Sequence, residues 1–432
     1  MIAIAMIGLP AASLFAAGEQ EQDAEDGPVE VDDVEIDVWH SLSEAAGAED
    51  FERYVEEFNE SQDDITVNVS YQGGYTDTLR AAESAVADDN PPNVSMFEQT
   101  RGAGFVDAEA LVPIGPLVDA DPELDLDDFF ERLLGTVTID DEVWGIPYNT
   151  STPIIYYNRD MFREAGLDPD EDVPETWDEL LEIGPEFAEY NDDDELEQWA
   201  FGLRTNPGWM FDAWLGQAGG QFLSDDGEEW VFNNDAGVEM AEYWLTLVEE
   251  DVAVPMDTGT TYDEFFAGNQ AMVFQSTATL ESYFDQADFD IGAAPLWSGE
   301  EEYAPIGGAN FYIFDVDDPE LHQASYEFLK WIVRERGYDF AAATGYHAPL
   351  RETVESDRMQ ERFEERPEAE ITYDQLESYA SPRTLVPFWG EVHNLQTLVS
   401  EEILLDGTDP QESLDDAVEE ANRLLRVYGI GR

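Results

Sequence analysis

Five polar or aromatic residues stand at the ends of expected strands, and they suit binding more than catalysis. They are Tyr75, Glu98, Ser151, Ser276 and Tyr346. In open α/β sheets, ligands sit at the carboxyl ends of the strands. Aromatic faces can stack on the C–H faces of a sugar or polyol, while hydroxyls and a carboxylate bond to its hydroxyl groups. This set therefore predicts a site for a polyhydroxylated solute.

The usual catalytic and cofactor motifs are missing from the sequence. No GxSxG nucleophile elbow, Walker A loop or GxGxxG loop occurs in the strand-to-helix context that it requires. The histidines His40, His322, His347 and His393 lie far apart, without HxxxH or HExxH spacing. The glycine pair in Ile306 to Asn310 precedes a strand, whereas phosphate-binding loops precede helices. We therefore expect a binding protein without cofactor or metal, and not an enzyme.

Two carboxylates could instead serve as the acid and base of a glycoside hydrolase. With 101 Asp and Glu residues, such pairs occur at every spacing by chance. A secreted hydrolase that uses Glu98 stays as the alternative. A surface-layer or adhesion protein would show repeats, and the sequence shows none. The acidic loop Asn191 to Glu197 lacks the twelve-residue calcium pattern and is interpreted as solvated surface.

The composition indicates a large globular protein with an extreme negative charge. The chain has 432 residues, enough for two or three domains, and 43% hydrophobic residues, enough for a large core. It has 101 acidic and 18 basic residues, a net charge of -83, and Lys330 as its single lysine. Such charge repels itself in dilute buffer but is screened at 1 M salt, where the Debye length is ~3 Å. We interpret it as adaptation to a salty environment. Nucleic acid and anionic membranes are poor partners because both require basic patches.

The N-terminus has the pattern of an export signal. In residues 1–18, the apolar run Ile2 to Gly18 closes on small residues, as a signal-peptide core and cleavage region do. Residues 19–33 follow as an acidic linker that is poor in core-forming residues. The sequence contains no cysteine, which excludes disulfides and thiolate metal sites. We expect an exported, extracytoplasmic monomer.

The expected elements alternate between strands and helices, which is typical of an α/β fold. Strand Ile36 to Ser41, helix Ala48 to Gln62 and strand Ile65 to Tyr71 form a βαβ unit, which requires parallel strands. Further strands are expected at Val94 to Glu98, Val143 to Asn149 and Ala271 to Gln275. Further helices are expected at Thr78 to Asp89, Thr176 to Tyr190 (with a capping box of Thr176 and Glu179), Gly237 to Asp251, Thr261 to Asn269, Leu321 to Ala343 and Ser413 to Gly429. These elements are too many for one sheet and predict two lobes.

Several segments carry a family resemblance through their joint order. They are VWHSLSEAAG, YQGGYTDTL, PYNTSTPIIYYNRDMFREAGLDP, PETWDEL, PIGGANFYIF and TGYHAPLRETV. Together they resemble the extracellular solute-binding proteins of ABC importers, and within that family the sn-glycerol-3-phosphate-binding members. The resemblance implies an α/β, two-lobed periplasmic-binding-protein fold of type II, with a hinge between the lobes. It also implies delivery of the solute to the transmembrane subunits of an ABC permease.

The resemblance divides the mature chain between two lobes. Lobe I is expected at residues 34–148 plus 308–345, and lobe II at residues 149–307 plus 346–432. Pro147 to Pro153 is expected to cross between them. Carried over by position, the site is expected to use Tyr75, Glu98, Ser151, Trp177, Ser276, Gly308, Tyr346 and Gln396. As alternatives, Trp177 could be a core residue and Gly308 could serve only a hinge conformation.

One departure from the family concerns the charge of the ligand. Gln396 stands where the glycerol-3-phosphate-binding members have an arginine that holds the phosphate. A glutamine lacks the charge-assisted, bidentate contact of a guanidinium. Arg383 or Arg101 could replace that arginine, or the ligand could be a neutral sugar, glycoside or polyol. We favour a neutral polyhydroxylated ligand and keep glycerol-3-phosphate or a related phosphodiester as the alternative.

Overall fold

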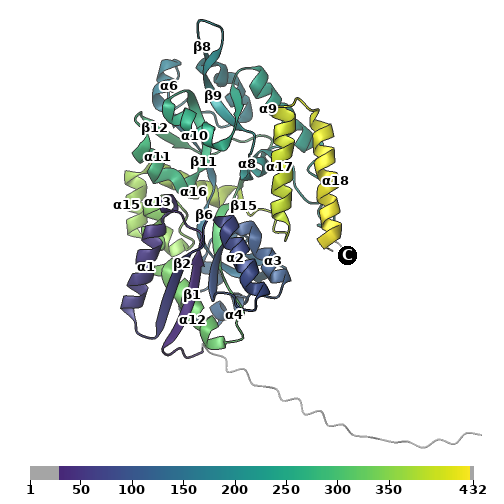
Figure 1. Ribbon diagram of the computed structural model, residues 1–432. Coiled ribbons are helices and arrows are strands. Elements are labelled where there is room, and N and C mark those ends of the chain that lie inside the picture. Colours follow the sequence, from purple (N-terminus) through teal and green to yellow (C-terminus); the bar gives the residue numbers. More distant parts are fainter. Residues whose placement is uncertain (1–28, 429–432) are drawn as a thin grey trace, which may run out of the picture.

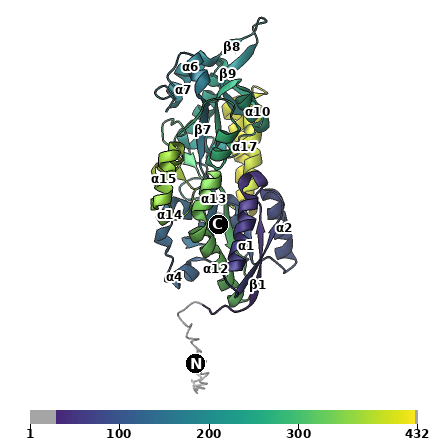
Figure 2. The same ribbon diagram turned by 90° about the vertical axis from the view of Figure 1, so that its left-hand side faces the viewer.

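A computed structural model of the protein describes residues 29–428 (Figure 1). The signal-peptide-like segment 1–18 and most of the acidic linker lie outside the described residues. The described chain is elongated and has one β-sheet toward each end, as the two perpendicular views show (Figures 1 and 2). Between residues 29 and 428, no helix combines the length and apolar character needed to cross a membrane.

The first sheet has five strands and contains the βαβ unit expected from the sequence. Its order is β2 (Ile65–Tyr71), β1 (Val34–His40), β3 (Val94–Glu98), β14 (Gly307–Ile313) and β6 (Gly145–Ser151). Strand β1 is parallel to β2 and β3, while β14 is antiparallel to β3 and β6. The helices of this part are α1 (Ala48–Ser61), α2 (Tyr75–Ala87), α3 (Gly102–Asp107), α4 (Gly115–Asp119), α5 (Glu131–Leu134), α12 (Pro319–Glu335) and α13 (Gly337–Thr344). Helix α1 packs through Phe51, Tyr54, Val55 and Phe58, the apolar positions that predicted it.

The second sheet follows the order β10 (Ala253–Met256), β9 (Leu196–Arg204), β11 (Gln270–Ser276), β7 (Pro153–Asn158) and β12 (Ile291–Ala294), with β8 (Glu189–Tyr190) paired to β9. Strands β10, β9 and β11 are parallel, and β7 is antiparallel to β11 and β12. Its helices are α6 (Arg159–Glu164), α7 (Trp177–Ile183), α8 (Trp209–Gln217), α9 (Asp235–Glu249), α10 (Thr258–Ala267), α11 (Leu280–Gln286), α14 (Arg351–Glu355), α15 (Asp357–Glu365), α16 (Pro367–Ser378), α17 (Trp389–Leu404) and α18 (Pro410–Tyr428). Helices α17 and α18 pack side by side along one flank (Figure 1).

The chain passes from the first sheet to the second within the segment Pro147 to Pro153. Strand β6 ends at Ser151 and β7 begins at Pro153, so Thr152 alone separates strands of different sheets. Two short ladders complete the fold, β4 (Thr138–Ile139) with β5 (Glu142–Val143) and β13 (Ala304–Pro305) with β15 (Ala380–Ser381). The lobe boundaries 148/149, 307/308 and 345/346 stay a prediction.

Two expected helices are shorter in the structure than in the sequence analysis. The helix expected at Leu321 to Ala343 divides at Arg336, which leaves the helical conformation with φ −124° and ψ −1°. The helix expected at Thr176 to Tyr190 ends at Ile183, just before Gly184 and Pro185, and proline has no N–H to continue the helical bonding.

The capping box expected at the start of α7 forms only in part. The Thr176 hydroxyl accepts a hydrogen bond from the Glu179 backbone N–H at 3.2 Å. The Glu179 carboxylate accepts from the backbone N–H of Glu175, at 2.8 Å, and not from that of Thr176. Because one of the two reciprocal bonds is displaced by a residue, the helix keeps its cap at Thr176 without the full motif.

Candidate functional site

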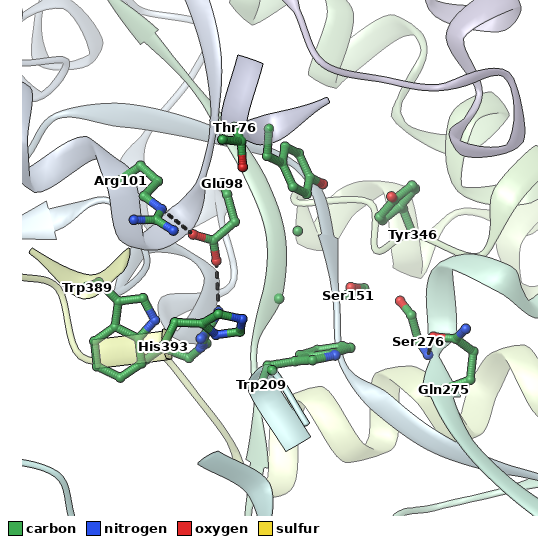
Figure 3. A pocket seen from close by; sticks show the side chains of 15 residues that line it. Thr76, Glu98, Arg101, Ser151, Trp209, Gln275, Ser276, Tyr346, Trp389 and His393 are labelled. Atoms are coloured by element: carbon green, nitrogen blue, oxygen red, sulfur yellow. Dashed lines mark hydrogen bonds and ion pairs between the residues drawn. The ribbon is translucent and has the colours of Figure 1, made fainter. Parts of the chain in front are cut away.

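A cavity of about 440 Å³ is lined by residues of both sheets (Figure 3). Glu98 ends β3 of the first sheet, and Ser276 ends β11 of the second. Both strands have parallel neighbours, so these two residues stand at carboxyl ends, where open α/β sheets bind ligands. The cavity therefore lies where the topology favours a ligand.

Six of the eight residues expected at the site line this one cavity. They are Tyr75, Glu98, Ser151, Ser276, Gly308 and Tyr346. They come from chain segments more than 270 residues apart and from both sheets. The remaining two, Trp177 and Gln396, lie elsewhere.

Trp177 is a core residue and does not line the cavity. Its ring stacks on Tyr243, with 4.5 Å between the centroids and 13° between the planes. Its indole N–H donates to Gln217 Oε1 at 2.9 Å. As the first residue of α7, it packs into the hydrophobic core beside the second sheet, with 7% of its surface exposed. The expectation that Trp177 belongs to the site is thus corrected, because its indole packs in the core and does not line the cavity.

Trp209, which the sequence analysis missed, supplies an indole to the cavity instead. It is the first residue of α8, the helix that follows β9 of the second sheet. Its ring packs so closely on Gly307 that a Cβ atom there would overlap it. The available signal was the pair Gly208 and Trp209, which Thr205 to Pro207 separate from the end of β9 at Arg204. In open α/β sheets, helices that begin near the carboxyl ends of strands border ligand sites.

Gln396 is completely buried and does not line the cavity, which corrects the second expectation. Its amide Nε2 donates to Asp212 Oδ1 at 2.7 Å. Asp212 also accepts from Arg383 Nε, at 2.5 Å, through its other oxygen. Gln396 therefore supports a buried carboxylate below the cavity wall. The side chain that this arrangement presents to the cavity is Arg383.

Arg383 joins Asp212 to Glu98. Its Nη1 donates to Glu98 Oε1 at 2.8 Å, and 6% of its side chain is exposed. Burial alone would lower the pKa of this guanidinium, but Asp212 and Glu98 outweigh burial and raise it. Burial raises the pKa of the Asp212 carboxyl, against the opposing effect of Arg383. A charged pair at this depth depends on both partners, because either alone would be a buried, uncompensated charge.

Glu98 is a fixed hydrogen-bond acceptor. Its Oε2 accepts from the Thr100 hydroxyl and from the Thr100 backbone N–H, the latter at 3.3 Å. The Arg101 Nε lies 3.7 Å from the same oxygen. A carboxylate whose position is fixed by these donors is suited to accept hydrogen bonds from the hydroxyl groups of a ligand.

The phenol groups across the cavity are held in place and are neutral. Burial raises the pKa of Tyr75 and of Tyr346. The Tyr75 hydroxyl accepts from Asn149 Nδ2 at 3.2 Å. The Tyr346 ring stacks on Phe340, with 5.5 Å between the centroids and 4° between the planes. Both hydroxyls are therefore protonated donors on rigid supports.

Gly308 has a conformation that favours glycine. Its φ is +95°, and a Cβ atom at this position would overlap the carbonyl oxygen of Asn149. The absence of a side chain lets β14 pair closely with β6 just before the chain crosses to the second sheet. This glycine also leaves the backbone at the cavity wall accessible to a ligand.

His393 is the only histidine among the residues that line the cavity, and it is uncharged near neutral pH. Burial is the main cause that lowers its pKa, and Arg383 lowers it further. Across residues 29–428, no group of three or more His, Asp or Glu side chains is arranged to hold a metal ion. The cavity thus offers hydroxyls, aromatic faces and charged groups as its means of recognition.

The chain is similar to known proteins over most of its length. Residues 53–370 match the family described as bacterial extracellular solute-binding protein. The sn-glycerol-3-phosphate-binding periplasmic protein UgpB of Yersinia pestis is 28% identical over 416 residues, covering 91% of this chain and 93% of that protein. The protein of the same name from Salmonella typhi is 27% identical over 426 residues, with the same coverage.

Solved structures share the fold. UgpB from Mycobacterium tuberculosis in complex with glycerophosphocholine has a TM-score of 0.80 at 21% identity, covering 92% of this chain and 99% of that one. The cyclic alpha-maltosyl-1,6-maltose binding protein from Arthrobacter globiformis has a TM-score of 0.79 at 24% identity, with the same coverage. The predicted two-lobed α/β fold of the periplasmic binding proteins is confirmed. The chain belongs to the family of bacterial extracellular solute-binding proteins and is a solute receptor, not an enzyme.

Proposed function

We propose that this protein is the extracytoplasmic receptor of an ABC importer and captures a polyhydroxylated solute in the cavity between its sheets. The observation that carries the proposal is the convergence of six residues, chosen from the sequence as solute contacts, on one cavity. Its volume of about 440 Å³ lies in the range of ~300–1,000 Å³ that is usual for small-molecule sites.

The chemistry of the lining fits a solute with several hydroxyl groups. Trp209 and Tyr75 offer aromatic faces, on which the C–H face of a sugar or polyol can stack. Ser151, Ser276 and Tyr346 offer hydroxyls, and Glu98 offers a carboxylate. The Ser276 hydroxyl oxygen accepts from the backbone N–H of Ala278 at 3.1 Å, so its own proton is directed elsewhere. Sugars, polyols and glycerophosphate-like compounds all meet this description.

Capture would proceed by closure of the two lobes about the solute. The single residue Thr152 joins strands of different sheets, and small changes in its φ and ψ would rotate one lobe against the other. Ser151 on β6 and Gly308 on β14 lie on paired strands next to this crossing, so closure would bring both against the solute. The closed form would then be recognised by the membrane subunits of the importer.

Export by the signal-peptide-like segment 1–18 belongs to the same proposal. The family is extracellular, and the apolar run Ile2 to Gly18 fits a secretory signal. The net charge of -83 fits a protein that works directly in a salty medium. Expression of the full chain in a secreting host, with N-terminal sequencing of the product, would show cleavage after the small residues that close this run.

A binding screen tests the proposed function. Melting temperatures and calorimetry in about 1 M salt would be recorded with glucose, maltose, glycerol, glycerol-3-phosphate and glycerophosphocholine. A ligand that binds the folded state raises the melting temperature with concentration, as mass action requires. We expect at least one of these solutes to do so without being converted to a product. Absence of binding across the panel would overturn the proposal.

A further inference from the structure

The cavity contains two arginines, and they differ in what their guanidiniums already bind. Arg383 donates Nε to Asp212 and Nη1 to Glu98 and is almost fully buried. Three of its five N–H donors have no hydrogen bond within residues 29–428, but any shift of the guanidinium toward a ligand would leave Asp212 without its ion-pair partner. Arg383 is therefore part of the cavity wall and is poorly placed to bind an additional anion.

Arg101 has its donors available. Its Nε lies 3.7 Å from Glu98 Oε2, which is an ion-pair distance longer than a hydrogen bond. Among residues 29–428, no hydrogen bond ties its guanidinium to another group, and 27% of its side chain is exposed. The guanidinium nevertheless lines the cavity, where it stands beside Glu98 (Figure 3). Two of its nitrogens can donate to the two oxygens of a planar, bidentate partner.

The first turn of α17 makes room for this guanidinium. A Cβ atom at Gly390 would overlap Arg101 Nη1, so the glycine allows the arginine to lie against the helix backbone. The neighbouring residues Trp389 and His393 line the same end of the cavity. Because α17 has 16 residues, its N-terminus adds a partial positive charge, ~+0.5 of an elementary charge, near the guanidinium.

We infer that Arg101, set against Gly390, forms an oxyanion subsite that selects a polyhydroxylated solute with a single negative charge. This inference rests on the proposed function of the cavity. The charges of Arg101 and Arg383 balance those of Glu98 and Asp212, which leaves only the partial charge of the helix end. One negative charge is therefore accommodated more easily than two, especially in a protein of net charge -83. A carboxylate of a sugar acid and a phosphodiester share this chemistry.

The remaining lining fixes the orientation of such a solute. In Figure 3 Arg101, Trp389 and His393 lie on one side of the cavity, and Tyr346, Ser276 and Gln275 lie on the opposite side. The charged end of the solute would bind at Arg101, and its hydroxyl groups would bind at Ser276 and Tyr346. Trp209 lies between the two sides, where a carbon chain or ring would stack.

The test compares charge selectivity in two variants. Arg101→Gln removes the guanidinium, and Arg80→Gln removes an equal charge from the exposed face of α2, outside the cavity. Dissociation constants would be measured by calorimetry in about 1 M salt for glucose, gluconate, glycerol, glycerophosphoglycerol and glycerol-3-phosphate. High salt screens the long-range repulsion between the protein and an anion, but it screens a contact at hydrogen-bond distance much less.

We expect the parent protein to bind gluconate or glycerophosphoglycerol at least about tenfold more tightly than the neutral analogue and than glycerol-3-phosphate. Arg101→Gln should remove this preference and leave the affinity for the neutral compound within about twofold, while Arg80→Gln should change neither. The identity of the preferred probe distinguishes a carboxylate from a phosphodiester. Equal loss of neutral and charged ligands in Arg101→Gln, or tight neutral binding without any preference in the parent, would overturn the inference alone. If no probe binds to the parent protein, the inference is overturned, and the proposed function falls with it only if maltose and glycerophosphocholine also fail to bind.

Discussion

The guanidinium of Arg383 lies 2.8 Å from Glu98 Oε1 and 2.5 Å from Asp212 Oδ2. A single arginine therefore binds two carboxylates, one from the first sheet and one from a helix beside the second. Glu98 ends β3 of the first sheet, and Asp212 belongs to α8 beside the second. Arg383 thus connects the two parts of the molecule directly at the cavity. Its loss would affect both the fold and the shape of the site.

Arg383→Gln should be strongly destabilising. Removal of the guanidinium leaves Glu98 and Asp212 partly or fully buried without their counter-charge, which typically costs about 3–5 kcal/mol of the free energy of unfolding. The matched control is Arg423→Gln, which breaks an exposed pair with Glu420 and should lower the free energy of unfolding far less. Denaturant unfolding in molar salt at pH 7.5 measures both. Similar losses in the two variants would contradict a structural role for the buried network.

Substitutions of Trp177 and Trp209 should have different effects, because the first should lower stability and the second should weaken solute binding. Trp177→Ala empties a packed core position, and we expect a loss of about 3–5 kcal/mol of stability with an unchanged dissociation constant for the folded protein. Trp209→Ala should instead weaken solute binding by at least ~10-fold, because the indole is part of the cavity lining. Unfolding and calorimetry on both variants provide the comparison. If Trp177→Ala weakened binding and Trp209→Ala did not, the assignment of the two indoles would be reversed.

Much of the fold could be predicted from the sequence because the elements are locally specified. The spacing of Phe51, Tyr54, Val55 and Phe58 predicts α1, and the segment Val94–Glu98 is a strand in the structure with the same bounds. The expected bounds of a helix were wrong where contacts with distant parts of the chain determine them. Arg336 interrupts the expected helix and forms an ion pair with Glu57 at 2.7 Å, a residue 279 positions away.

The lining of the candidate site could be predicted where a residue ends a strand. It could not be predicted where the direction of a side chain decides whether it faces the cavity or the core. Glu98 and Ser276 follow from strand ends, which topology brings together. Trp177 and Trp209 each begin a helix, so sequence alone does not distinguish the indole that faces the core from the one that faces the cavity. Gln396 was placed in the site by register with relatives, but α17 directs it toward Asp212 below the cavity wall.

Gly308→Ala should be more costly than a substitution at other glycines with positive φ. A Cβ atom at Gly308 would overlap the Asn149 carbonyl oxygen, and an alanine at φ +95° is strained by itself. Gly166 has φ +84° with open space around it, so Gly166→Ala isolates the backbone strain, about 1–2 kcal/mol. We expect Gly308→Ala to exceed that loss and also to weaken solute binding. Equal losses of stability in the two variants would show that β6 and β14 adjust to the added methyl group.

Salt should stabilise the fold by screening. The net charge of -83 destabilises the compact state, and the Debye length falls from ~10 Å at 0.1 M to ~3 Å at 1 M salt. We expect the melting temperature to rise steadily over this range of sodium chloride. Sucrose at matched osmolality is the control, because it stabilises by exclusion from the surface and does not screen charge. If sucrose raised the melting temperature as much as the salt did, the charge would not be the cause.

The buried imidazole of His347 should make stability depend on pH. Burial lowers its pKa to about 4, from its usual value of 6.5. The unfolded chain therefore binds a proton that the folded chain does not, and the contribution of His347 is fully present above pH 6.5 and is lost as the pH falls toward 4. Carboxylates titrate in the same range, so the difference between the parent and His347→Gln is the informative quantity.

At pH 7.5, His347→Gln should be the less stable protein, because the ring packs against Tyr373 with 5.2 Å between their centroids. At pH 4 the gap should narrow by roughly 2–3 kcal/mol, since the variant has no imidazole to protonate. Denaturant unfolding of both proteins at intervals between pH 7.5 and 4, in molar salt, measures this change. His347 also pairs with Thr150 through its backbone N–H, at 2.8 Å, next to the crossing between the sheets. A gap that stayed constant with pH would show that the imidazole has the same pKa in the folded and unfolded states, and the crossing would then have to accommodate a positive charge at low pH.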